Sequence, residues 1–170
     1  MNKTLSVALA LLGGYVLQVS LAPQLAVFGV VPNFMFLVVV TIALTQGPVS
    51  GGVAGFVGGL VFDLLNAGVV GPFALVLAVV GYVAGALNAN LFAEGWLLPV
   101  TVVAVASLAT EVSYGLILAV LGTGPQFWDG LLTVVVPSVI YHTALAVILY
   151  PLLARLLRTE RPMKSFRRLA

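Results

Sequence analysis

The fold class of this chain is decided by the stretch GPVSGGVAGFVGGLVFDLL, residues Gly47–Leu65. It carries a single charge, Asp63, and approaches the ~20 mainly apolar residues that a helix needs to cross a bilayer. Residues four apart lie nearly above one another on a helix, so glycine at every fourth position predicts a slowly winding groove for a closely packed neighbour. The glycines of this groove are Gly47, Gly51, Gly55 and Gly59.

The next apolar segment repeats the pattern with Gly81 and Gly85, which makes it the expected partner of the glycine groove. Two uses of the groove are open from the sequence. The favoured use is packing within the chain, and the other is that part of the groove receives a partner's helix or a ligand. Gly52 and Gly58 lie off the groove and keep the second use open, because they make the helix slender on more than one side.

The composition of the whole chain indicates the same class. Of its 170 residues, 62% are apolar and 7% are charged, and the mean hydropathy is +1.21. A soluble domain carries about a quarter charged residues, so a soluble enzyme and a separate extramembrane domain are both excluded. The chain has no cysteine and one histidine, which excludes disulfides, thiolate metal sites and imidazole-rich metal sites. We expect no cofactor and no metal.

Glycine, proline, asparagine and the few charges divide the chain into six apolar segments. They predict one all-α transmembrane domain over residues 1–157 and a basic cytoplasmic tail over residues 158–170. A kink or local unwinding is expected at Pro137, inside the last segment. The six predicted spans lie near Leu5–Leu21, Asn33–Thr45, Val49–Leu65, Pro72–Asn88, Trp96–Leu121 and Asp129–Leu157.

The basic residues predict the orientation of the bundle. Lys3 precedes the first span, and all the other lysines and arginines follow from Arg155 onward. Basic flanks stay in the cytoplasm, and an even number of spans places both termini on one side, so we expect an N-in, C-in protein. The tail charges favour contact with anionic headgroups of the lipid bilayer. No basic face with interleaved aromatic residues is available for nucleic acid.

Three ionisable side chains fall inside the predicted spans: Asp63, Glu111 and His142. An unpaired charge at that depth costs at least ~2.5 kcal/mol, and no basic residue between Lys3 and Arg155 exists to pair with the acids. Glu111 and His142 fall at comparable depth, which gives the hypothesis that they meet. The favoured role is a structural polar cluster that fixes helix register. The alternatives are a contact with a partner or ligand, and a proton relay or catalytic site.

The signal for catalysis is weak. Ser107, Ser113 and Ser138 are present, but none stands in the Gly-x-Ser-x-Gly context of a serine nucleophile. A catalytic aspartate pair is not expected, because the second aspartate, Asp129, sits at a helix end. Gln18 in the first span is expected to donate a hydrogen bond between helices.

Several short motifs occur in an order that is typical of one known family. Pro32-Asn33 opens the second span, and Glu111 stands where an acid is expected in the fifth. A core of the form Gly-Phe-x-x-Gly-hydrophobic-x-x-Asp-Leu is matched by Gly55-Phe56, Gly59-Leu60 and Asp63-Leu64. Further matches are Gly71, Tyr82 and the Phe127-Trp128 pair before a proline-containing last helix. In this order and spacing, the chain resembles the rod shape-determining MreD family.

The resemblance implies a non-enzymatic scaffold of the cell-elongation machinery in the bacterial inner membrane. It implies binding to an MreC-type bitopic protein, and a part in coupling MreB filaments to RodA/PBP2-type peptidoglycan synthases. The implied fold is similar to the six-helix substrate-binding subunits of energy-coupling-factor transporters. That similarity supplies the alternative function, a membrane-embedded subunit that binds a small, vitamin-like molecule. A homo-oligomer stays open. The candidate packing or partner-contact residues are Pro32, Asn33, Gly51, Gly55, Gly59, Asp63, Gly81, Gly85, Glu111 and His142.

Overall fold

The structure is a computed structural model that describes residues 3–27, 29–66, 68–90, 97–123 and 131–157. Over these residues the chain is all-helical, with six α-helices and no strand, as the sequence predicts. The helices are α1 (Lys3–Ser20), α2 (Phe34–Gln46), α3 (Pro48–Leu65), α4 (Pro72–Asn90), α5 (Leu97–Val120) and α7 (Val136–Leu157). Two further turns are the 3-10 turn η1 (Ala22–Leu25) and the π-helical turn η2 (Leu131–Val135).

Four helices are long and apolar enough to cross a membrane: α1, α3, α5, and the last helix taken from Thr133 to Leu157. The other two, α2 and α4, are apolar but shorter. The bounds of the first five helices agree with the predicted spans to within two residues at either end. The sequence predicts the last span from Asp129, whereas α7 begins at Val136, because η2 takes up Leu131–Val135. The basic tail over residues 158–170 lies outside the described residues.

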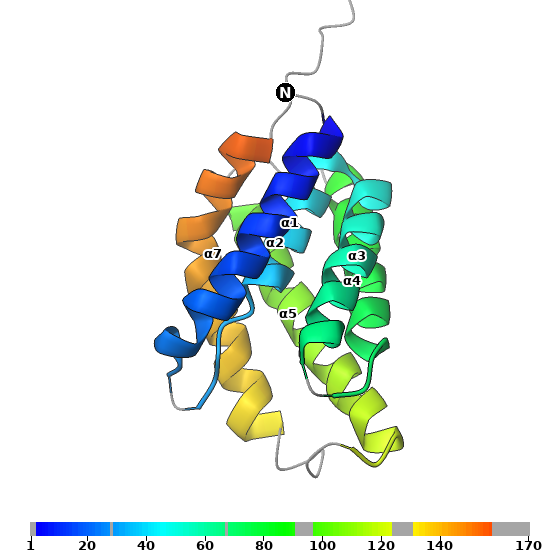
Figure 1. The fold of residues 1–170 in the computed structure, drawn as a ribbon. Helices are drawn as coiled ribbons and strands as arrows, with labels where there is room; N and C mark the ends of the chain where they lie inside the picture. The colour runs from blue at the N-terminus through cyan, green and yellow to red at the C-terminus, as the bar shows by residue number, and fades with distance from the viewer. Residues whose placement is uncertain (1–2, 28, 67, 91–96, 124–130, 158–170) are drawn as a thin grey trace, which may run out of the picture.

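The short helix α2 forms the centre of the bundle. Every residue from Phe34 to Leu44 is buried, because α1, α3, α4, α5 and α7 all contact this helix. Figure 1 shows α7 on one side of it, α3 and α4 on the other, and α1 in front. A helix that is apolar all round is stable where neighbours cover every face, which places α2 in the middle of the bundle.

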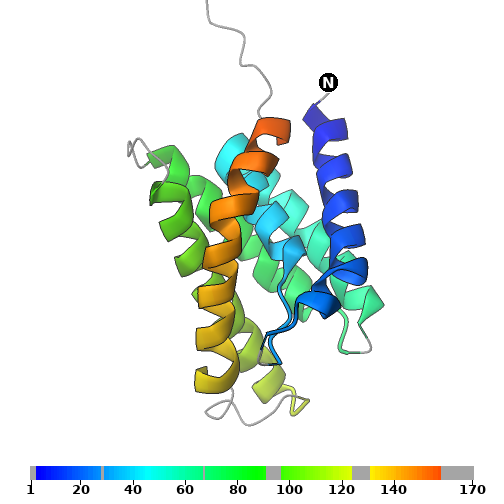
Figure 2. The ribbon, with the colours of Figure 1, turned by 90° about the vertical axis from the view of Figure 1, so that its left-hand side faces the viewer.

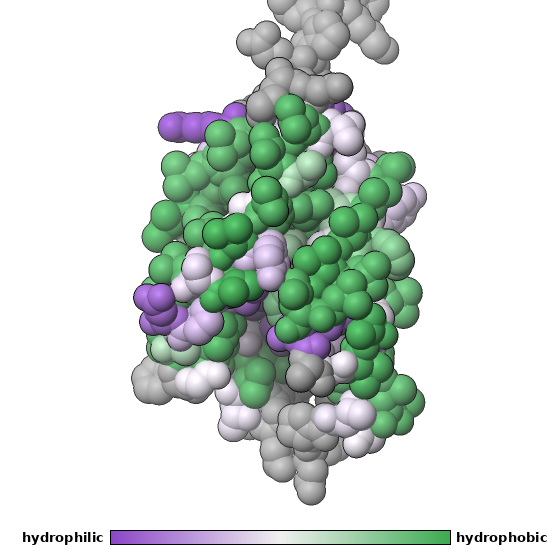
Figure 3. All heavy atoms as spheres, viewed as in Figure 1, coloured by the Kyte–Doolittle hydropathy of each residue, from purple (hydrophilic) through white to green (hydrophobic). Residues whose placement is uncertain are grey.

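The surrounding helices each turn an apolar face outward. Leu12, Val53, Leu75 and Leu156 are all more than half exposed, and each belongs to a different helix. Figure 3 shows apolar side chains over most of the face formed by α1 and α3. A surface of this kind is stable in lipid, where exposed apolar side chains carry no cost.

The described chain begins and ends at one end of the bundle, and the turns η1 and η2 lie at the other. The start of α1 and the end of α7 lie at the same end, which Figures 1 and 2 both show at the top. At the other end, η2 replaces regular α-helix just before Pro137, as the sequence predicts. Pro137 thus falls in the first turn of α7, directly after the change of helix type, and the proline that lies inside regular α7 is Pro151. The Tyr141 hydroxyl donates to the Leu25 carbonyl and ties α7 to η1.

Candidate functional site

The glycine groove of α3 is filled by α4 of the same chain. Gly51 and Gly81 approach so closely that a Cβ added to either one would lie against the backbone carbonyl of the other. Dispersion contacts between two bare backbones therefore hold α3 against α4. This is the packing within the chain that the sequence favours, and it leaves no room in the seam for a partner's helix. Backbone approach of the same kind occurs at Gly55, Gly59 and Gly85.

Asp63, one step beyond the last glycine of the groove, caps α4. Its Oδ2 accepts hydrogen bonds from the backbone N–H of Gly71 at 2.9 Å and of Ala74 at 3.0 Å. The first N–H groups of a helix have no partner within that helix, and the helix dipole favours a negative charge beside them. Asp63 is 3% exposed. The partner of this acid is therefore a helix end of its own chain and not a basic side chain.

A second set of polar contacts surrounds the start of α2. Asn33 is the N-cap of this helix, and its side-chain oxygen accepts from the Phe36 N–H at 2.9 Å. Gln18 of α1 reaches the same place. Its side-chain oxygen accepts from the Phe34 N–H at 2.7 Å, and its amide nitrogen donates to the Pro32 carbonyl at 3.2 Å. The sequence predicts that Gln18 donates a hydrogen bond between helices. In the structure its donated bond goes to Pro32, just before α2, and it is the acceptor in its bond to α2 itself.

His142 of α7 joins this set from the other side. Its Nε2 accepts from the Asn33 backbone N–H at 2.9 Å, and its Nδ1 lies 2.8 Å from the Ser107 Oγ of α5. His142 and Ser107 are both almost fully buried. We call Gln18, Asn33, Ser107 and His142 the α2 cap cluster. It links four helices around the first turn of α2.

The hydrogen bonds of the α2 cap cluster fix the protonation of His142. A backbone N–H can only donate, so Nε2 carries no proton, and the neutral ring carries its proton on Nδ1. Nδ1 therefore donates to the Ser107 hydroxyl. A serine nucleophile needs the opposite arrangement, in which the hydroxyl donates its proton to the histidine. The Ser107–His142 contact is arranged for holding helices and not for nucleophilic attack.

Glu111 stands apart from the α2 cap cluster. It lies one helical turn after Ser107 on α5 and is partly buried, and its carboxylate makes no hydrogen bond or ion pair with a described residue. The hypothesis that Glu111 meets His142 is corrected by the structure, because both ring nitrogens of His142 are bonded to Asn33 and Ser107. Helix geometry gives the reason: Ser107, one turn earlier, is the α5 residue level with His142.

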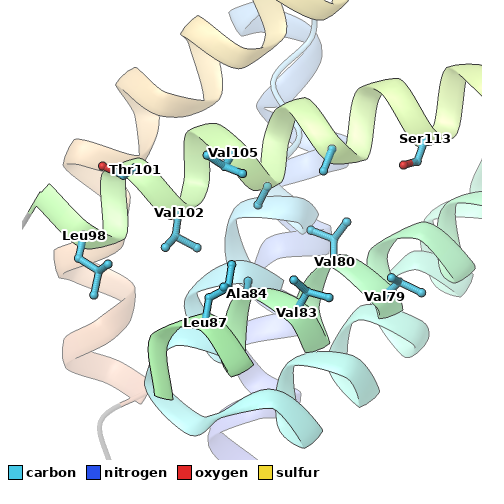
Figure 4. Close-up of a pocket in the computed structure, with 12 residues that line it drawn as sticks. Val79, Val80, Val83, Ala84, Leu87, Leu98, Thr101, Val102, Val105 and Ser113 are labelled. Atoms are coloured by element: carbon cyan, nitrogen blue, oxygen red, sulfur yellow. The ribbon is translucent and has the colours of Figure 1, made fainter. Parts of the chain in front are cut away.

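An apolar groove of about 350 Å³ runs between α4 and α5 (Figure 4). Four of its α5 residues recur at every fourth position and form one row along the helix. In Figure 4, Val79, Val80 and Val83 of α4 face this row across the groove. The row consists of Thr101, Val105, Ala109 and Ser113.

The sequence did not assign Ser107 or Gln18 to the start of α2. From the sequence, Ser107 is only a candidate nucleophile, and Gln18 is only a donor between helices with no named partner. One signal was present: a span as short as the second predicts a helix end that needs polar neighbours inside the bundle.

Among the described residues, no group of three or more His, Cys, Asp or Glu side chains is placed to hold a metal ion. Asp129 lies outside the described residues.

The fold and its buried polar contacts define a small, all-helical membrane protein. A family model described as rod shape-determining protein MreD matches residues 1–160. The chain therefore belongs to this family of shape-determining membrane proteins, which is part of the MreBCD shape machinery. Its membership implies a role in determining rod shape. Neither the curated proteins nor the solved structures that were searched gave a match.

Proposed function

We propose that this protein is a non-enzymatic scaffold of the rod-shape machinery in the bacterial inner membrane. It binds an MreC-type bitopic protein and helps to couple MreB filaments to peptidoglycan synthesis by RodA/PBP2-type enzymes. The observation that carries the proposal is the family match over residues 1–160. The buried polar groups support a scaffold, because Asp63 and His142 both serve helix ends within the chain.

The scaffold crosses the membrane six times with both termini in the cytoplasm, and residues 158–170 form its basic tail. Two observations support this arrangement. The basic residues stand before and after the predicted spans, and the start of α1 and the end of α7 lie at one end of the bundle. The likeness to binding subunits of energy-coupling-factor transporters stays a prediction, since no solved structure matched.

The groove between α4 and α5 is the surface that we assign to the transmembrane helix of the MreC-type partner. The α3–α4 seam is closed, so a partner helix needs another face of the bundle. The α4–α5 groove contains no charged residue, and small side chains let a second helix approach its floor. These small side chains are Ala84, Ala106, Ala109 and Ser113.

Substitution of Ala109 by tryptophan tests this assignment. Ala109 is exposed and lines the groove, so an indole there blocks the approach of a helix without entering the core. Leu108→Trp is the matched control, because Leu108 is exposed at the same depth but does not line the groove. The measurement is the amount of MreC-type protein that co-purifies from membranes. We expect Ala109→Trp to lower it at least about tenfold, equal to ~1.4 kcal/mol, and Leu108→Trp to leave it unchanged.

Two outcomes would contradict the proposal. Equal recovery of the partner with both variants would show that the partner's helix binds another face of the bundle. Recovery of ATPase and coupling subunits in place of an MreC-type protein would favour the alternative, a vitamin-binding transporter subunit.

A further inference from the structure

A second groove, of about 340 Å³, lies between α1 and α3 and differs from the α4–α5 groove in having a polar end. Its length is lined by apolar side chains such as Val7, Leu11 and Val53. Its polar lining residues gather where α1 and α3 begin. Figure 3 shows this face of the molecule, with less hydrophobic residues near the upper end of an otherwise apolar surface. The polar residues are Lys3, Thr4, Gln46 and Ser50.

The polar end of the groove is positively charged. Lys3 makes no ion pair with a described residue. The two acids in the part of the chain that the structure describes are Asp63, near the end of α3, and Glu111, in the second half of α5. Asp63 lies beyond the reach of the Lys3 side chain, because α3 begins beside Lys3 and reaches Asp63 only after four helical turns. Glu111 belongs to α5, and no residue of α5 lines this groove. An occupant of this end should therefore carry negative charge.

The same end contains an acceptor without a donor. The amide nitrogen of Gln46 donates to the Leu157 carbonyl at 3.4 Å, but its side-chain oxygen is buried with no hydrogen-bond partner among the described residues. A buried acceptor is stabilised by a neighbour that supplies a hydroxyl or N–H group. Gln46 lines the groove and its amide is held by one long hydrogen bond, so a rotation of the side chain brings this oxygen to an occupant. The occupant should therefore carry a donor as well as a negative charge.

We propose that this groove binds one molecule of phosphatidylglycerol. An acyl chain lies along Val7, Leu11 and Val53, the phosphate pairs with the Lys3 ammonium, and a glycerol hydroxyl donates to the Gln46 side-chain oxygen. A membrane lipid supplies all three features at one membrane surface. A partner's apolar helix would instead bury the Lys3 charge without a partner, which is unfavourable.

Native mass spectrometry of the delipidated, full-length protein tests the site. The protein is titrated with phosphatidylglycerol and, separately, with phosphatidylcholine that has the same acyl chains. We expect one phosphatidylglycerol to bind in preference to phosphatidylcholine. Lys3→Gln should weaken that binding about fivefold, the change expected for one basic side chain near an anionic headgroup. Arg155→Gln is the matched control, because Arg155 is an exposed basic residue at the same end but outside the groove.

Two further variants separate the parts of the site. Ala8→Trp fills the groove from an exposed position and should abolish the preference for phosphatidylglycerol, whereas Leu5→Trp, on the same helix but outside the groove, should not. Gln46→Leu should lower the affinity for phosphatidylglycerol more than that for phosphatidic acid, which lacks the glycerol hydroxyls of the headgroup. The proposal fails if phosphatidylglycerol and phosphatidylcholine bind equally well to the unchanged protein. It also fails if Arg155→Gln weakens phosphatidylglycerol binding as much as Lys3→Gln, or if Ala8→Trp leaves that binding unchanged.

Discussion

At the scale of single residues, several of the polar side chains inside this bundle serve helix ends. α2 has 13 residues and is therefore ~20 Å long, shorter than the ~30 Å hydrocarbon core of a bilayer. Its ends cannot both reach water, so its first N–H groups need partners from the protein. Gln18, Asn33 and His142 supply them. Asp63 does the same for α4.

Replacement of His142 by leucine should destabilise the fold. Leucine leaves the Asn33 N–H buried without an acceptor, which costs about 1–3 kcal/mol. The free energy of unfolding in mixed detergent micelles, measured against increasing denaturing detergent, gives the size of the loss. Thr143→Val is the control, because the Thr143 hydroxyl bonds only to the Val139 carbonyl one turn back in α7. A His142→Leu protein as stable as the control would show that the hydrogen bonds of His142 contribute nothing to stability.

The partners of these residues could not be read from the sequence. The sequence indicates that Asp63, Glu111 and His142 need partners, since charge and polarity inside a span are costly. Which groups meet depends on how the helices are placed. Asn33 and His142 are 109 positions apart in the chain, and their contact exists only because α7 packs against the start of α2.

At the scale of elements, the pairing of α3 with α4 is the most extensive contact between any two of the described helices. Its cause lies in the sequence, because glycine at every fourth position of α3 removes the side chains that would separate the two backbones. The off-groove glycines behave differently. Gly58 faces Met35 and Leu11, whereas a Cβ at Gly52 would have ordinary contact with Tyr82.

Two glycine-to-alanine changes on α3 should therefore have opposite effects. Gly55→Ala forces a methyl group against the backbone of Leu77 and Ala78, and we expect a loss of at least about 1–3 kcal/mol in the free energy of unfolding. Gly52→Ala meets Tyr82 at 3.4 Å, so it should be neutral or stabilise the helix by up to ~1 kcal/mol. Thermal unfolding of the two purified variants in one detergent compares them directly. Equal melting temperatures would contradict the close packing at Gly55.

At the scale of the whole molecule, five of the described helices surround the sixth, α2. The six predicted segments agree with the observed helices, because breaks in apolar runs mark helix ends whatever their neighbours. The composition of α2 is consistent with its central place, since no face of this helix is polar. The hydrogen bonds that secure its first turn come from α1 and α7, and only the assembled bundle brings these helices together.

Reporter fusions should find both ends of the chain in the cytoplasm. Green fluorescent protein fused after Ala170 should fluoresce, and alkaline phosphatase at the same place should be inactive, because basic flanks are retained in the cytoplasm. Alkaline phosphatase fused after Gly122, beyond the end of α5, should be active. Removing positive charge with Lys3→Gln is an informative control, since the six basic residues from Arg155 onward should still hold the orientation. An active phosphatase after Ala170 would refute this topology.

The sequence by itself determined the class of protein, the six helices and the pairing of α3 with α4. Each of these follows from apolar length or from spacing within one or two neighbouring segments, which the chain carries wherever it folds. The tertiary structure alone decided that the start of α4 is the partner of Asp63, and that Asn33 and Ser107, not Glu111, are the partners of His142. It also decided where grooves remain on the surface. Hydrogen bonds require contact within about 3 Å, and distances that short between remote segments are set by the packing of the bundle as a whole.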